Sequence, residues 1–261
     1  MKLKNKLLLS TLLIGISTYS FASMEDCTIA SLKKDYDKAI EECLPYAEKD
    51  NIDAQVLITN AYAQIEDYKN ALKYGLKVDN YYSKKTVPTN KNELKSYTGT
   101  LTGIGNIYYF GQAGKADKTK GLEYITRAAN LGNNFAQNQL GDFYASKDEF
   151  PGRNLATAYK WYEIAVDQSY DPAKNGVFMT NLPTITQQAP YCIAMGEQLV
   201  AEAYIDGSAG LPKDNSKAKE YLNQAIALYQ DNKPTAENTK YCPTGADKLN
   251  LESAKKELDS L

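Results

Sequence analysis

The chain contains no histidine. Histidine is the commonest general base in enzymes, the partner of Ser and Cys nucleophiles in many hydrolases, and the commonest metal ligand. A GxSxG motif and a Walker A motif are missing as well. These absences weigh against hydrolase and nucleotide chemistry, so we expect a protein that is not an enzyme and that carries no metal or cofactor.

Basic residues are not in excess either. The chain has 30 Lys and Arg against 32 Asp and Glu, a net charge of −2, and removal of the three lysines of an N-terminal signal would bring it to −5. Nucleic acids and anionic membranes attract basic patches. Beyond the N-terminus, no stretch approaches the roughly twenty apolar residues of a transmembrane helix. We therefore expect neither a nucleic-acid partner nor membrane insertion.

The N-terminus has the features of a cleavable secretory signal. Three lysines in the first six residues precede a short apolar run at 7–16, which is too short to span a bilayer. The small residues Ser20 and Ala22 suit a signal peptidase, so we predict a signal peptide at 1–22 with cleavage after Ala22. Cys27 lies too far from this cut for a lipoprotein. A periplasmic or secreted protein of a Gram-negative bacterium is expected.

Four cysteines lie in the exported part of the chain: Cys27, Cys43, Cys192 and Cys242. An even number of cysteines in an oxidising compartment indicates disulfides, and four cysteines allow three connectivities. We favour Cys27 with Cys43 and Cys192 with Cys242, because each pair belongs to one end of the repeats described next. Metal binding is the alternative, although the CxxC spacing that zinc sites prefer is missing.

Two patterns recur along the chain. The first is an aliphatic residue, a small residue beside it and a tyrosine three further on: Ile58-Thr59-x-x-Tyr62, Ile104-Gly105-x-x-Tyr108, Leu140-Gly141-x-x-Tyr144 and Val200-Ala201-x-x-Tyr204. The second is a small residue, an aromatic three later and an alanine or valine four beyond: Ala71-Tyr74-Val78, Gly121-Tyr124-Ala128, Ala158-Trp161-Ala165 and Ala218-Tyr221-Ala225. Such spacings mark one helix face, so each unit is predicted to be an antiparallel helix pair.

The spacing between the two patterns points to a family. Tyr62 and Tyr74 are 12 residues apart, whereas the corresponding aromatics of the later units are 16 or 17 apart. The first unit resembles a tetratricopeptide repeat, and the later units resemble Sel-one-like repeats, which have a longer, glycine-bearing turn. The resemblance is clearest from Leu199 to Leu222. It implies an all-α fold, an α-solenoid of antiparallel helix pairs wound into a right-handed superhelix.

The domain boundaries follow from these units. The four repeats are predicted at 51–79, 97–131, 134–168 and 196–230 within a repeat region that spans 51–230. We expect a degenerate N-terminal repeat or cap at 23–50, with a lone second helix, and a C-terminal capping helix within 231–261. The lysine- and asparagine-rich segment 79–95 is predicted to be a loop or hinge. An insertion at 175–195 precedes the last unit. The glycine-rich run at 99–114 is attributed to helix packing.

The candidate binding residues come from the resemblance to tetratricopeptide-type solenoids, in which the first helix of each pair lines the concave surface. The implied groove positions are Asn60, Asn106, Asp142 and Glu202, with Asn138 and Gln198 one turn earlier. This polar, mildly acidic stripe suits a peptide or loop, although simple solvation explains it equally well. Tyr109 and Tyr191 lie off the two patterns and join the candidates, because exposed tyrosine offers a large contact area; tyrosines of the patterns themselves are expected in the core.

The leading functional hypothesis is a monomeric exported interaction module that binds a protein partner through its groove or inserted loop. One alternative is an immunity protein against an antibacterial effector such as a type VI secretion lipase, since exported Sel-one-like proteins include such inhibitors. A second is a β-lactam binder or hydrolase, as some cysteine-rich Sel-one-like proteins are. Those proteins place a cysteine pair in every repeat, whereas the central repeats here have none.

Overall fold

The computed structural model describes residues 23–243, 245 and 247–261, so the predicted signal peptide at 1–22 lies outside the described residues. The described residues form helices and no strand. The helices are α1 (Met24–Leu32), α2 (Tyr36–Ala47), α3 (Ile52–Gln64), α4 (Tyr68–Ser83), α5 (Lys91–Phe110), α6 (Lys118–Asn130), α7 (Asn134–Ala145), α8 (Leu155–Asp167), α9 (Asp171–Lys174), α10 (Val177–Thr180), α11 (Leu182–Gln188), α12 (Pro190–Asp206), α13 (Asn215–Asp231), α14 (Ala236–Thr239) and α15 (Leu251–Asp259).

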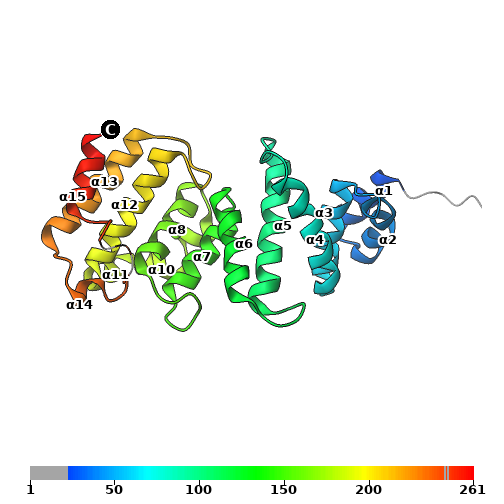
Figure 1. Cartoon of the computed structure of the whole chain (residues 1–261), viewed down its shortest axis with the longest axis horizontal. Helices are drawn as coiled ribbons and strands as arrows, with labels where there is room; N and C mark the ends of the chain where they lie inside the picture. Colours follow the sequence, from blue (N-terminus) through cyan, green and yellow to red (C-terminus); the bar gives the residue numbers. More distant parts are fainter. Residues whose placement is uncertain (1–22, 244, 246) are drawn as a thin grey trace, which may run out of the picture.

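The helices pack in consecutive pairs, which confirms the predicted all-α fold of antiparallel helix pairs. The pairs are α1–α2, α3–α4, α5–α6, α7–α8 and α12–α13, and α15 packs on α13 at the end. Figure 1 shows them following one another along the long axis, from the N-terminal pair at one end to α15 at the other. Within the described part of the chain, no helix is long and apolar enough to cross a membrane.

Short polar residues start nearly every helix of the stack. A cap side chain that accepts hydrogen bonds from the N–H groups of the first turn stabilises a helix start by about 1 kcal/mol. Asparagine plays this role for the first helices α3, α5 and α7, through Asn51, Asn90 and Asn133. Aspartate does so for the second helices α2, α4, α6 and α13, through Asp35, Asp67, Asp117 and Asp214. The same local signal therefore sets the helix starts in successive units.

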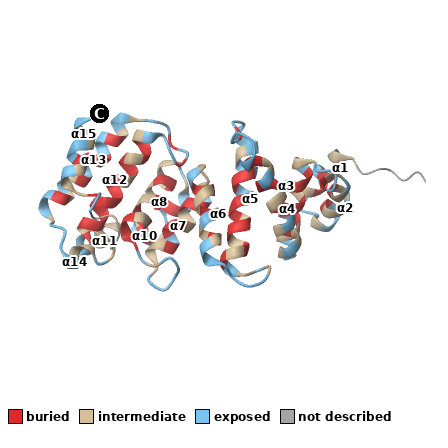
Figure 2. Cartoon of the chain, in the orientation of Figure 1, coloured by how far each residue is buried: buried red, intermediate tan, exposed pale blue. Residues whose placement is uncertain are grey.

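Small residues let the two helices of a unit approach each other, as the repeat patterns predicted. A Cβ atom on Gly105 of α5 would lie 2.9 Å from the carbonyl oxygen of Gly121 on α6. A Cβ atom on Gly121 would lie 2.6 Å from the backbone nitrogen of Tyr109. Only glycine fits at these two positions. Buried residues lie on the facing sides of the paired helices (Figure 2), in one large cluster from Val78 to the C-terminal helices and two smaller ones in the first units.

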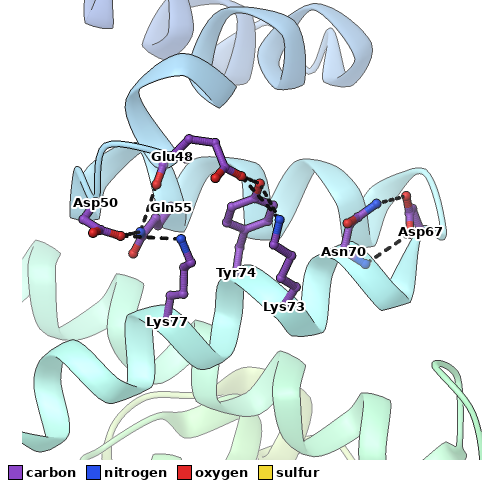
Figure 3. Close-up of polar contacts among 9 residues, drawn as sticks. Glu48, Asp50, Gln55, Asp67, Asn70, Lys73, Tyr74 and Lys77 are labelled. Carbon is purple, nitrogen blue, oxygen red and sulfur yellow. Dashed lines mark hydrogen bonds and ion pairs between the residues drawn. The ribbon is translucent and has the colours of Figure 1, made fainter.

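The repeated tyrosines join the helices within a unit and then join one unit to the next. Tyr62 stacks on Tyr74, with ring centroids 5.8 Å apart, and equivalent stacks occur at Tyr108–Tyr124 and Tyr204–Tyr221. The Tyr74 hydroxyl donates to Glu48, which also accepts from Lys73 (Figure 3). Tyr124 likewise donates to Asp79, and Tyr221 to Asp167. Each hydroxyl thus reaches a carboxylate of the preceding unit.

Both ends of the stack carry a disulfide. Cys27 on α1 is bonded to Cys43 on α2, and Cys192 on α12 is bonded to Cys242 in the segment before α15. This is the connectivity that the sequence analysis favoured. The segment around Cys242 also contacts the α7–α8 pair, because the backbone N–H of Leu155 on α8 donates to the carbonyl oxygen of Tyr241 at 2.7 Å.

Several helix boundaries differ from the sequence-based ones. The N-terminal region 23–50 holds a complete pair rather than a lone second helix, because α1 packs on α2 without carrying either repeat pattern. Helix α5 begins at Lys91, inside the predicted loop 79–95, since Asn90 caps it and its polar first turns are exposed. Helix α12 begins at Pro190, inside the predicted insertion, because proline is well tolerated in the first turn of a helix.

Candidate partner-binding site

A groove runs between α3 and α5, the first helices of two consecutive units. In its narrower part, of about 430 Å³, the α3 wall consists of Val56, Leu57, Thr59, Asn60 and Ala63. The α5 wall consists of Lys95, Ser96, Gly99, Thr100 and Gly103. The groove widens to a second part of about 890 Å³ that shares Val56, Leu57 and Ser96 with the first. We call the two parts together the α3–α5 groove.

The walls of the narrower part are mostly apolar. Thr59 donates its hydroxyl to the Gln55 carbonyl oxygen of its own helix at 2.7 Å, and Thr100 does the same to Ser96 at 3.0 Å. Threonine hydroxyls bonded in this way leave the groove fewer free donors. The apolar side chains of Val56 and Leu57, half-buried on α3, face across to α5.

Gly99 and Gly103 form a bare strip on the α5 wall. A Cβ atom added to either residue would meet no described atom within 4 Å beyond the adjoining backbone of α5 itself. Glycine in the interior of a helix costs about 0.5–1 kcal/mol relative to alanine. Packing among the described residues therefore explains Gly105 and Gly121 but not Gly99 and Gly103, which corrects the attribution of the whole glycine-rich run to helix packing.

The wide end of the groove is acidic. Glu25 of α1, Asp53 of α3 and Glu93 of α5 line it, together with Met24, Thr28, Ile52, Asn92 and Tyr82. All three carboxylate residues are exposed. Burial raises the pKa of Tyr82, and its 2.9 Å hydrogen bond to Glu93 and the nearby charges of Glu93 and Asp53 raise it further. Among the described residues that line the groove, the basic one is Lys95, which lies one turn before Gly99 on α5.

Of the predicted binding residues, Asn60 lines this groove and is exposed. Two others are tied to neighbouring residues. Asn106 accepts a hydrogen bond from Gln139 at 2.6 Å, which links α5 to α7. Asn138 donates to Asp142 at 3.1 Å within α7.

The two acidic residues of the predicted stripe, Asp142 and Glu202, interact with neighbouring side chains. The Asp142 carboxylate also accepts from the Tyr162 hydroxyl at 2.6 Å, and loss of solvation raises its pKa. Glu202 on α12 is half-buried, and burial together with the charge of Glu257 raises its pKa. The predicted stripe thus spans several units, and only Asn60 belongs to the α3–α5 groove.

Three predicted binding residues are buried, which corrects their interpretation. Gln198 is 0% exposed and donates to Ser253 at 3.0 Å and to Glu257 at 2.7 Å, because α15 covers it. Tyr109 is 1% exposed, stacks on Phe143 at 4.2 Å and donates to the Phe150 carbonyl oxygen at 2.6 Å. These two residues stabilise the fold and are not available to a partner.

Tyr191 is also 1% exposed. Its ring meets that of Tyr229 edge to face, with centroids 5.0 Å apart, and its hydroxyl points to the Leu249 carbonyl oxygen at 3.4 Å. Tyr229 belongs to α13 of the same unit, whereas Leu249 belongs to the C-terminal segment, outside the repeats, where the repeat pattern gives no sign of the contact.

Glu197 is a buried carboxylate that the sequence did not reveal. It lies on α12 where the earlier units have Gln55 and Gln137, whose amides donate to backbone carbonyl oxygens eight residues earlier. Glu197 is 5% exposed; one oxygen accepts from Tyr159 at 2.7 Å, and the other has no hydrogen-bond partner among the described residues. Burial, with nearby Glu163, raises its pKa to about 8. A substrate would not reach it there.

Among the described residues, no group of three or more Asp, Glu and Cys side chains is placed to hold a metal ion. The carboxylates of the wide end of the groove instead provide a negative field at the surface, suited to a positively charged group of a partner.

Comparison with known proteins identifies the repeats. Residues 101–133, 134–170 and 191–229 match the Sel1 repeat family, which covers the α5–α6, α7–α8 and α12–α13 units. No curated protein is similar enough to match the chain.

Two solved structures are similar to the chain. One is a Sel1 repeat protein from Oxalobacter formigenes, with 18% identity and a TM-score of 0.40 over 73% of this chain and 45% of that one. The other is a protective antigen present in uropathogenic Escherichia coli strains that displays an SLR fold, with 16% identity and a TM-score of 0.34 over 85% of this chain and 63% of that one. The chain spans less than two thirds of the length of either. The chain thus contains three Sel1 repeats, the repeat unit of the SLR family.

Proposed function

We propose that this chain is an exported, non-catalytic scaffold that holds a protein partner in the α3–α5 groove. The observation that carries the proposal is the bare strip at Gly99 and Gly103. These glycines weaken a 20-residue helix, and among the described residues no other part of the chain lies against them. A residue choice that costs stability without a packing benefit inside the chain is accounted for if a partner approaches the α5 backbone there.

Export is supported by two independent features. The first 22 residues have the composition of a secretory signal, and all four cysteines of the chain are paired in disulfides, which persist in oxidising compartments. The expected mature protein begins at Ser23. Mass spectrometry of the protein recovered from periplasm and culture medium tests this directly, and an intact Met1 on the recovered protein would contradict it.

Site-specific photo-cross-linking in the producing cell tests the binding role. A benzophenone side chain at Asn60, inside the groove, is expected to capture a discrete partner, whereas one at Ala227, exposed on α13, is not. The substitution Gly103→Trp fills the groove and should abolish the adduct. Equal capture at both positions, or an adduct that survives Gly103→Trp, would refute the proposal.

The identity of the captured partner also tests the more specific roles. Neutralisation of an antibacterial effector is one form of this function, and recovery of such an effector would establish it; recovery of another envelope protein would exclude it for this groove. A role in β-lactam hydrolysis predicts nitrocefin turnover by the purified protein. The proposal predicts none.

A further inference from the structure

We infer that the occupant of the α3–α5 groove is an α-helix of the partner, with small residues toward Gly99 and Gly103 and lysine or arginine toward Glu25, Asp53 and Glu93. This inference rests on the proposed function and specifies what the groove recognises. It follows from three features of the groove: backbone chemistry, shape and charge.

The backbone chemistry of the groove favours a helix over an extended segment. Both walls are helices whose own backbone groups are paired, so an incoming strand would find no edge to which it could add. The backbone N–H and C=O groups of an extended segment would need hydrogen-bond partners in a mostly apolar groove. The hydroxyls of Thr59 and Thr100 already donate to carbonyl oxygens of their own helices. A helix satisfies its backbone internally and brings only side chains to the walls.

The shape of the α5 wall selects small residues on that helix. Gly99 and Gly103 are four positions apart and therefore lie on one face of α5, one above the other. Two helices approach closely where both present small residues at this spacing, because backbone and Cβ atoms then make the contact. Val56 and Leu57 on the opposite wall provide the apolar surface for the other side of the same helix.

The charge of the wide end selects basic residues. Glu25, Asp53 and Glu93 come from three different helices and converge on this end, and none of the described residues that line it is basic. Asp53 and Glu93 also lie in the first turns of α3 and α5, where a negative charge is favourable to the helix dipole. Glu25 occupies the first turn of α1. The helix dipole thus accounts for an acidic residue at the start of each of the three helices. It does not account for the position of all three carboxylates at one end of the same groove.

Synthetic peptides test the inference without knowledge of the natural partner. The probe is a fluorescein-labelled helical peptide of about 18 residues, close to the length of α5, with alanine at every fourth position and two lysines at one end. One comparison peptide has glutamates in place of the lysines, and another has leucines in place of the alanines. Fluorescence anisotropy with the full mature protein should give a dissociation constant about tenfold or more lower for the probe than for either comparison peptide.

Variants of the protein separate the groove from other surfaces. The triple change Glu25→Gln, Asp53→Asn and Glu93→Gln should reduce the preference for lysine over glutamate to less than about threefold, whereas Asp37→Asn, in the first turn of α2, should leave it unchanged. Asp37 thus controls for the loss of an acidic residue at a helix start.

Replacement of Gly99 and Gly103 gives a second test, because it should raise the stability of the protein and weaken its binding of the probe. Gly99→Ala with Gly103→Ala should raise the melting temperature by about 4 °C, because alanine favours the helix, and should weaken probe binding at least about fivefold. A purely structural role for these glycines predicts lower stability and unchanged binding.

The inference is wrong if the probe does not bind, if the glutamate or leucine peptide binds as well, or if the alanine variant binds as well as the parent. Its failure is distinguishable from failure of the proposed function. A partner cross-linked at Asn60 through an acidic or extended segment would leave the function intact and overturn this inference. Absence of any groove-dependent partner would overturn both.

Discussion

Replacement of Glu197 by glutamine should make the stability of the protein less dependent on pH. In the unfolded chain this carboxyl group titrates near 4.5, whereas burial raises its pKa in the folded protein to about 8. Below pH 4.5 the group is neutral in both states. Between pH 4.5 and 8 the unfolded state releases the proton and the folded state retains it, so the free energy of unfolding falls as pH rises. Above pH 8 both states are ionised and the loss stops.

The magnitude follows from the same two values. Each pKa unit corresponds to about 1.4 kcal/mol, so the carboxylate costs the folded state up to about 5 kcal/mol at pH 9. The nearby carboxylates Glu163, Asp167 and Glu220 also raise the pKa of Glu197. The calculated cost is therefore an upper bound on the cost of ionising Glu197. Glutamine keeps an oxygen that can accept from the Tyr159 hydroxyl and carries no charge at any of these pH values.

The assay is urea unfolding without reductant at pH 5, 6.5, 8 and 9. Wild type and Glu197→Gln should have similar free energies of unfolding at pH 5, and the variant should become progressively more stable toward pH 9. Glu41→Gln, at an exposed position on α2, is the matched control and should run parallel to wild type. If Glu197→Gln also runs parallel to wild type, the buried carboxylate ionises normally and the reasoning fails.

Three further predictions concern the fold. Replacement of both Cys27 and Cys43 by serine should lower the free energy of unfolding by about 3 kcal/mol and replacement of both Cys192 and Cys242 by about 4 kcal/mol, because the closed loops contain 16 and 50 residues; equal effects measured by urea unfolding would count against the chain-entropy explanation. Tyr221→Phe should cost about 1–3 kcal/mol, because it leaves Glu163 and Asp167 without a shared donor, and an unchanged midpoint would show that the bonds contribute nothing. Gly105→Ala should lower the melting temperature, whereas Gly99→Ala in the same helix should raise it; a rise in both would contradict the close approach of α6 at Gly105.

The helix pairs could be predicted because their signal is local. Small residues and tyrosines recur at helical spacing in four units, and polar caps mark the helix starts. Helix α1 escaped prediction because it carries neither pattern and is held on α2 by the Cys27–Cys43 disulfide and by packing. The start of α5 escaped because its lysines and asparagines are typical of loops and of exposed helix turns alike.

The binding site was harder to predict because it depends on what lies opposite a residue. Gly99 and Gly105 belong to the same glycine-rich run, yet one faces open space and the other faces the α6 backbone. The sequence cannot separate them without the placement of α6. Gln198 is a groove position by its place in the repeat and Tyr191 lies outside both patterns, yet both are buried and both contact the C-terminal segment. Contacts made by segments outside the repeats leave no periodic trace in the sequence.

The most direct test of the α3–α5 groove is the dissociation constant of the partner captured at Asn60 for two tryptophan variants of the purified protein. Gly103→Trp fills open space in the groove, and Ala227→Trp adds the same side chain at an exposed position on α13. With both variants folded by circular dichroism, Gly103→Trp should weaken binding by about 100-fold or more, and Ala227→Trp should leave it at the wild-type value. Equal affinity of the two variants would contradict the assignment of the groove as the binding site.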